Sequence, residues 1–125
     1  MHQVNLCIRI AGTGSCVPDR VVPNAELVER AGTRESWVVE NLGIHERRVI
    51  GVGEFSSDLG TKAGRRALDA AGLSPNDLDV IIVATATPDR GSPSTACIVQ
   101  HKLGVTNGCP AFDLNAVCSG FLYAM

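Results

Sequence analysis

The sequence predicts an α/β fold in which helices cover a mostly parallel sheet, and two observations lead to this prediction. Residues 80–84 form the continuous apolar run Val-Ile-Ile-Val-Ala, which is typical of a strand that is covered on both faces. Segments with strand and helix character also alternate along the chain, as they do in layered α/β folds with parallel sheets.

The first segments of the chain contain a strand, a turn and two short helices. Residues 4–10 predict the strand, and residues 12–15, Gly-Thr-Gly-Ser, favour a tight turn; the third glycine of a dinucleotide-binding loop is absent. Asn24 is expected to cap a helix at 25–31. Thr33 is expected to cap a second helix that ends at Gly43.

An exposed strand and a long helix come next. Residues 44–49 alternate apolar and polar side chains, and a glycine-rich turn follows at 51–53. The clearest helix runs from Ser56 or Ser57 to a stop at Gly72. Its many small residues predict that it packs closely on a sheet.

The second half of the chain supplies the buried strands. A turn at 74–77 precedes the apolar run described above. Ser92, followed by Pro93, is expected to cap a helix at 94–103 that closes at a glycine. Residues 111–115 then predict a further strand of the covered sheet, which leads directly into the start of a last helix.

Composition and charge are those of one modest globular domain. The chain has 125 residues, 45% of them hydrophobic, with 13 Gly and 6 Pro, and we find no repeat, linker or low-complexity tract. With 11 Lys or Arg against 13 Asp or Glu, the net charge of -2 speaks against nucleic-acid binding. The longest apolar run is too short to span a bilayer and residues 1–5 do not resemble a signal peptide, so we expect a cytoplasmic protein without membrane association.

One of the five cysteines occupies a position suited to catalysis. Cys118 lies between the last predicted strand and the helix after it, where a tight turn exposes a nucleophile. The start of the helix favours a thiolate, and backbone N–H groups there can stabilise an oxyanion. The alternative is a small buried residue at a crowded junction. No zinc spacing occurs, and we interpret the other four as structural free thiols: Cys7, Cys16, Cys97 and Cys109.

The stretch 108–121, Gly-Cys-Pro-Ala-Phe-Asp-Leu-Asn-Ala-Val-Cys-Ser-Gly-Phe, resembles the active-cysteine segment of β-ketoacyl-acyl-carrier-protein synthase III, a condensing enzyme of the thiolase superfamily. The resemblance covers nearly all of residues 4–125. Its further motifs fall in the family's order: 12–15 with Pro18, 33–37 with 43–44, 46–47, 83–87, 93–94 and 103–104.

The resemblance implies a fold, a reaction and three site residues. The fold is the thiolase-like layered one, of which residues 1–125 form an incomplete first half of a duplicated unit. Cys118 matches the nucleophile that takes an acyl group from acyl-CoA, before a decarboxylative condensation with malonyl-acyl-carrier protein. Trp37 matches a residue that stacks on the CoA adenine, and Thr33 one that hydrogen-bonds near it; from the sequence pattern alone, Trp37 is a core anchor. No permanently bound cofactor is implied, and the full-length protein is expected to be a homodimer.

The sequence departs from the family's pattern in three ways. Asn41 stands where many members carry an Arg that helps to hold CoA, and Ser92 stands where many carry a Phe beside the partner's acyl pocket. The family's catalytic His and Asn lie beyond the residues present, and neither His45 nor His101 matches that His. We therefore expect a truncated or proteolysed piece, or one part of a larger assembly, that ends just after the nucleophile turn. Alone it should have marginal stability and can at best be acylated.

Two further functions stay open at this stage. One is an acyltransferase that uses the same cysteine but transfers the acyl group to a hydroxyl or an amine, outside primary fatty-acid synthesis. The other is a non-catalytic fragment that binds CoA or a partner chain.

Overall fold

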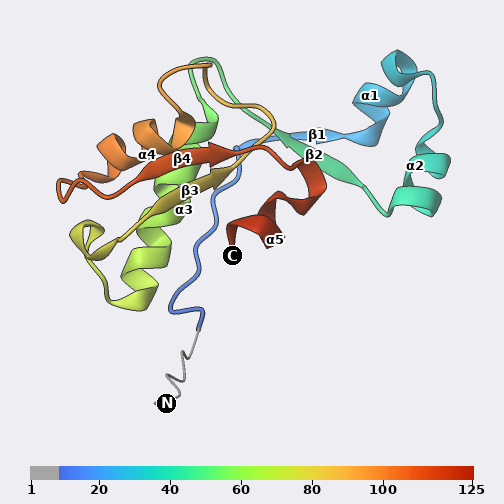
Figure 1. Ribbon diagram of the computed structural model, residues 1–125. Helices are drawn as coiled ribbons and strands as arrows, with labels where there is room; N and C mark the ends of the chain where they lie inside the picture. The colour runs from blue at the N-terminus through green and yellow to red at the C-terminus, as the bar shows by residue number, and fades with distance from the viewer. Residues whose placement is uncertain (1–8) are drawn as a thin grey trace. The chain divides into compact units, whose positions relative to one another are not determined.

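A computed structural model describes residues 9–125 of the chain, which falls into two compact units (Figure 1). Unit 1 comprises Met1–Cys16 and Ser56–Met125, and unit 2 comprises Val17–Phe55. One continuous piece was predicted, because no change in composition along the sequence marks the boundaries of unit 2. No helix among residues 9–125 is long and apolar enough to cross a membrane.

Unit 2 is a two-stranded antiparallel ribbon with two short helices between its strands. Its elements are β1 (Arg20–Pro23), α1 (Asn24–Ala31), α2 (Glu35–Leu42) and β2 (Glu46–Val49). The register pairs Arg20 with Val49 and Pro23 with Glu46. The exposed strand predicted at 44–49 is confirmed as β2, but its partner β1 was missed because four residues that include a proline give little strand signal.

The helix ends of unit 2 agree with prediction, whereas the helix starts do not. Gly32 and Gly43 end α1 and α2 in the left-handed conformation, as predicted. Asn24 is not a cap: it is the first residue of α1, is fully buried, and directs its side chain away from its own helix. Thr33 does not cap α2 either, because the N-cap position is Arg34, without a side-chain cap hydrogen bond.

In its described part, from residue 9 onward, unit 1 contains a two-stranded parallel sheet, three helices and two short 3₁₀ turns. Its elements are α3 (Ser56–Ala71), η1 (Pro75–Asp77), β3 (Ile81–Ala84), α4 (Thr95–Leu103), β4 (Ala111–Leu114), η2 (Val117–Ser119) and α5 (Gly120–Ala124). The register pairs Ile81 with Ala111 and Ala84 with Leu114, which confirms the predicted parallel pairing.

The core of unit 1 lies where α4 packs against α3 and the sheet. Its buried members are Ile81, Ala96, Val99 and Leu103. The predicted strand at 80–84 is not covered on both faces, since Val80 is 44% exposed and Ala84 is also exposed. An apolar cavity of about 590 Å³ extends between α3 and β3.

The small residues of α3 serve a purpose different from the one predicted. Gly60 and Gly64 face Val99 and Leu103 of α4, so they allow two helices to approach each other rather than a helix to approach a sheet. The segment around Gly14 also packs against α3, because a Cβ added at Gly14 would overlap the backbone oxygen of Ala63.

The prediction of a tight turn at 12–15 is wrong. Residues 9–18 contain no regular element, and neither Gly12 nor Gly14 has a positive φ. These glycines are needed because backbone lies directly against the α3 backbone, with a Cβ at Gly12 placed 2.8 Å from the nitrogen of Ala71. Of the strand predicted at 4–10, only Arg9 and Ile10 are described, and they are not in a strand.

The helix predicted at 94–103 is confirmed as α4, but its cap is displaced by two residues from the prediction. Ser94, not Ser92, is the N-cap, and its hydroxyl accepts a hydrogen bond from the N–H of Cys97 at 3.2 Å. Gly104 ends the helix in the left-handed conformation, as predicted.

Candidate active site

Cys118 lies at the centre of η2, in the turn that joins β4 to α5 (Figure 1). Its side chain is exposed, so the alternative of a buried cysteine at a crowded junction is wrong for this chain. The N–H of Ser119 donates to the carbonyl of Ala116 at 3.0 Å, which closes the turn around the cysteine. A nucleophile held in this manner is accessible to a substrate while its backbone is fixed.

The residue before the cysteine has a strained backbone. Val117 has φ +47°, and within residues 9–125 it is the one non-glycine residue with a positive φ. A β-branched side chain in this conformation costs about 1 to 2 kcal/mol. Strain of this kind persists where the surrounding structure holds it, and such positions cluster at functional sites.

Gly120 sets the close packing on the other side of the cysteine. It is buried at the start of α5, and a Cβ there would lie 3.2 Å from the Cβ of Ala84 at the end of β3. The N–H of Thr85 donates to the carbonyl of Leu114 at 3.1 Å and extends the strand pairing by one residue. Cys118 therefore lies beyond the carboxyl ends of two parallel strands, the edge at which α/β sheets bind ligands.

Asp113 fixes β4 to the helix next to it and was not singled out from the sequence. Its two carboxylate oxygens accept the N–H groups of Thr95 and Ala96, each at 2.8 Å, at the start of α4. A carboxylate at a helix start is stabilised by the unpaired N–H groups and the helix dipole. Asp113 could have been found in the sequence, because it is an acidic residue inside an otherwise apolar strand.

The other cysteines differ from Cys118 in exposure. Cys97 receives a hydrogen bond from the Ser94 hydroxyl at 3.1 Å and donates to the carbonyl of Ala111 at 3.5 Å. Cys109 packs against the core of unit 1, and Cys16 is half-buried. Cys7 lies outside the described residues. Within residues 9–125 these thiols are free and no group of acids, histidines or cysteines is arranged to hold a metal ion.

Thr33 and Trp37, the two residues expected to bind CoA, lie together in unit 2. With Gly32 and Arg34 they line an open depression at the junction of α1 and α2. Trp37 is 47% exposed, so the alternative of a core anchor is wrong. The indole face is accessible for stacking, as a nucleotide base requires. Arg34 was not predicted as a site residue, although an arginine beside the expected CoA residues was a visible signal in the sequence.

The remaining residues singled out from the sequence are all exposed. Asn41 uses its side-chain amide to donate to the carbonyl of Trp37 at 2.8 Å, within α2. Ser92 lies in the loop before α4, and His45 and His101 are both exposed.

The sequences of known proteins similar to this chain carry one recurring name. No family model matches the chain. It is 56% identical over 117 residues to the β-ketoacyl-acyl-carrier-protein synthase III of Thiobacillus denitrificans, and 55% identical over 117 residues to that of Neisseria meningitidis serogroup A. Each match covers 94% of this chain and 37% of the relative, so the chain spans little more than a third of their length.

Solved structures give the same result. The chain superposes on 3-oxoacyl-acyl-carrier-protein synthase III from Aquifex aeolicus with a TM-score of 0.84 and 45% identity, over 92% of this chain and 37% of that one. It also superposes on the priming β-ketosynthase of the R1128 polyketide pathway with a TM-score of 0.85 and 34% identity, over 96% and 37% of the two chains. The predicted thiolase-like α/β fold is thus confirmed for the part present.

Proposed function

From these similarities we propose that this chain is part of a β-ketoacyl-acyl-carrier-protein synthase III and that it carries the acyl-accepting half of a condensing reaction. Acyl-CoA is the donor and Cys118 the acceptor. The acylated cysteine then serves in a decarboxylative condensation with malonyl-acyl-carrier protein, in fatty-acid or related biosynthesis. The observation that supports the proposal most directly is the exposed Cys118 in the turn from β4 to α5, immediately after the strained Val117.

The chemistry of the first step follows from the residues around the cysteine. The Cys118 sulfur attacks the thioester carbonyl, a new carbon–sulfur bond forms, and the bond to the CoA sulfur breaks. The thiol proton ends on the departing CoA thiolate, so the step needs no further reactant. Backbone N–H groups at the start of the turn are the donors suited to the oxyanion that forms on the carbonyl oxygen.

The condensation step needs groups outside the residues present. The family resemblance implies a His and an Asn for decarboxylation, and neither His45 nor His101 has the expected position in the sequence. We therefore propose that this chain on its own takes up an acyl group and releases no β-keto product. Acyl transfer to a hydroxyl or an amine is the competing reaction, and it differs in the product formed.

We propose that the acyl donor of this chain differs from that of family members that carry the usual Arg at position 41 and the usual Phe at position 92. By the family resemblance, Ser92 stands in place of a bulky Phe beside the partner's acyl pocket and would leave more room there, while Asn41 stands in place of a cation beside CoA. The similarity to a protein described as a priming β-ketosynthase of polyketide synthesis also favours a donor outside primary fatty-acid synthesis.

Intact-mass spectrometry of the purified chain with a panel of acyl-CoAs tests the proposal. We expect one acyl increment, mapped to the peptide that contains Cys118 and absent from Cys118→Ala. Cys16→Ala, which removes a half-buried thiol of the same unit, is expected to keep the adduct. An unmodified wild-type chain, or an increment spread over several cysteines, would contradict the assignment of Cys118 as acceptor.

A further inference from the structure

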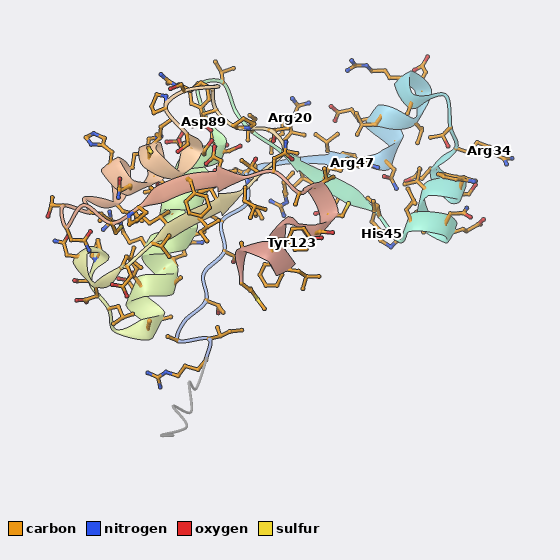
Figure 2. The ribbon with its side chains drawn as sticks, in the orientation of Figure 1. Arg20, Arg34, His45, Arg47, Asp89 and Tyr123 are labelled. Atoms are coloured by element: carbon orange, nitrogen blue, oxygen red, sulfur yellow. The ribbon has the colours of Figure 1, made fainter. Side chains whose placement is uncertain are left out.

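The depression in unit 2 contains a cation in addition to the two residues expected there. Arg34 lines it with Thr33 and Trp37. In Figure 2 the Arg34 side chain projects outward from the start of α2. The depression thus presents an aromatic face, a hydroxyl and a positive charge within five consecutive residues, 33–37.

The Arg34 guanidinium differs in its contacts from three arginines of unit 2, and it differs from the fourth, Arg30, in lining the depression. Arg20 pairs with Glu26 at 2.6 Å, and Arg47 donates to the Asn24 side chain at 2.7 Å. Arg48 donates to two backbone carbonyls. Arg34 makes no side-chain hydrogen bond or ion pair with any of residues 9–125, so its charge is available to a ligand.

A guanidinium next to an exposed indole suits the adenosine end of a nucleotide that bears phosphate. The base stacks on the aromatic face, while the planar guanidinium donates two hydrogen bonds to phosphate oxygens. CoA has phosphate at two places within an arginine's reach of its adenine: the ribose 3′-phosphate and the 5′-diphosphate. The backbone turn at Gly32, with φ +61°, places Thr33 and Arg34 at the rim between the two helices.

We propose that Arg34 is the phosphate-binding cation of the CoA site in this chain, taking the part that the family resemblance gives to the arginine replaced by Asn41. The inference rests on the proposed function, because it takes CoA as the ligand of this depression. It goes beyond that function because it assigns the phosphate-binding charge to Arg34. This residue precedes Trp37 in the sequence, whereas Asn41 follows it. Arg34 thereby becomes a residue that determines affinity for phosphorylated donors.

The chain provides its own reporter for this site, since Trp37 is its single tryptophan. We would titrate the chain with CoA, 3′-dephospho-CoA and adenosine, and follow the Trp37 fluorescence. Arg34→Ala is expected to raise the Kd for CoA about five- to tenfold, and to leave the Kd for adenosine unchanged. Raising the salt from about 0.05 M to about 0.5 M should weaken CoA binding to the wild type more than to Arg34→Ala.

Three further variants separate charge from structure. Arg34→Lys, which keeps the charge without the planar fork, should lose no more than about threefold in CoA affinity. Arg30→Ala is the matched control, because Arg30 lies in the last turn of α1 and does not line the depression. Asn41→Arg combined with Arg34→Ala should recover part of the lost affinity.

The 3′-dephospho-CoA titration identifies which phosphate Arg34 contacts. If the loss caused by Arg34→Ala disappears with that ligand, the contact is to the 3′-phosphate; if it persists, the contact is to the 5′-diphosphate. An unchanged CoA Kd in Arg34→Ala overturns the inference, and so does an equal loss for adenosine, because Arg34 would then act through the shape of the site.

The same titration distinguishes failure of this inference from failure of the proposed function. A wild-type chain that acquires an acyl group on Cys118 but shows no CoA-dependent fluorescence change overturns the Arg34 inference alone. A wild-type chain with neither response overturns the proposed function as well.

Discussion

The two units of this chain are stabilised in different ways, although each contains part of the proposed chemistry. Unit 1 has an apolar cluster between α3, α4 and the sheet, and backbone pressed against backbone at Gly12 and Gly14. Within 17–55, unit 2 buries the apolar residues Pro18, Val22 and Val38, together with the polar Asn24. We infer that close apolar packing stabilises unit 1, whereas unit 2 depends more on the hydrogen bonds of a buried amide.

The Asn24 side chain takes the place of a larger core in unit 2. Its amide nitrogen donates to the carbonyl of Ile44 at 2.7 Å, and its oxygen accepts from Arg47 at 2.7 Å. Both partners belong to the segment that enters and forms β2, so one side chain connects the first residue of α1 to the strand across the ribbon. A buried amide with both sides satisfied specifies one arrangement of its neighbours.

The largest effect is expected where a methyl group would have to enter unit 1. Gly14→Ala should lower the free energy of unfolding by about 3 kcal/mol, because the new Cβ meets backbone atoms of α3 that cannot rotate away. Gly91→Ala is the matched control, since nothing lies within 4 Å of a Cβ there. Thermal unfolding of both variants measures the difference; equal midpoints would show that residues 12–14 do not pack on α3 as described.

The next effect is expected in unit 2 and tests its dependence on one amide. Asn24→Ala should cost about 2 kcal/mol, because the Ile44 carbonyl and the Arg47 guanidinium lose a buried partner. Amide hydrogen exchange should show the loss of protection in α1 and β2 while α4 is unaffected. Asn41→Ala, which removes an exposed amide, provides the control. Equal loss of protection in α4 would contradict the separation of the two units.

A smaller effect of opposite sign is expected at the cysteine turn. Val117→Gly relieves the left-handed strain and should raise the free energy of unfolding by about 0.5 to 1 kcal/mol, while it slows acylation of Cys118 by loosening the turn. Val52→Gly, in an exposed turn without a positive φ, should give no gain. Denaturant unfolding and the rate of adduct formation measure the two quantities, and faster acylation of Val117→Gly would show that the strain has no part in positioning the cysteine.

The smallest effect concerns an exposed carboxylate in unit 1. The N–H of Ser74 donates to Asp77 at 2.7 Å, and this bond, with that of the Ser74 hydroxyl, holds the pKa of Asp77 below its ordinary value of 3.8. Because the folded pKa is lowered, the stabilisation is present above pH 3.8 and is lost as the pH falls through the folded value. The difference in Tm between wild type and Asp77→Asn should therefore shrink in that acidic range. A difference that is constant with pH would exclude the charge as its cause.

Local signals in the sequence predicted much of the fold. Gly32, Gly43, Gly72 and Gly104 end the predicted helices, each with a positive φ, because a left-handed residue at a helix end depends on the residue itself. The pairing of β3 with β4 also followed from the apolar run and the order of elements. The helix starts were less predictable, since Asn24, Thr33, Ser92 and Ser94 are all residues that favour caps, and long-range contacts select among them.

The sequence by itself determined which residues are proposed to take part in the chemistry, and the tertiary structure decided how they are presented. Cys118 could be singled out because its place between a strand and a helix depends on neighbours along the chain, whereas Thr33 and Trp37 were singled out by the family resemblance. That the indole is half-exposed, that Val117 is strained, and that Arg34 joins the depression while Asn24 is buried could not be predicted. Exposure, strain and hydrogen-bond partners depend on segments that are distant in the sequence, so they are fixed only once the chain has folded.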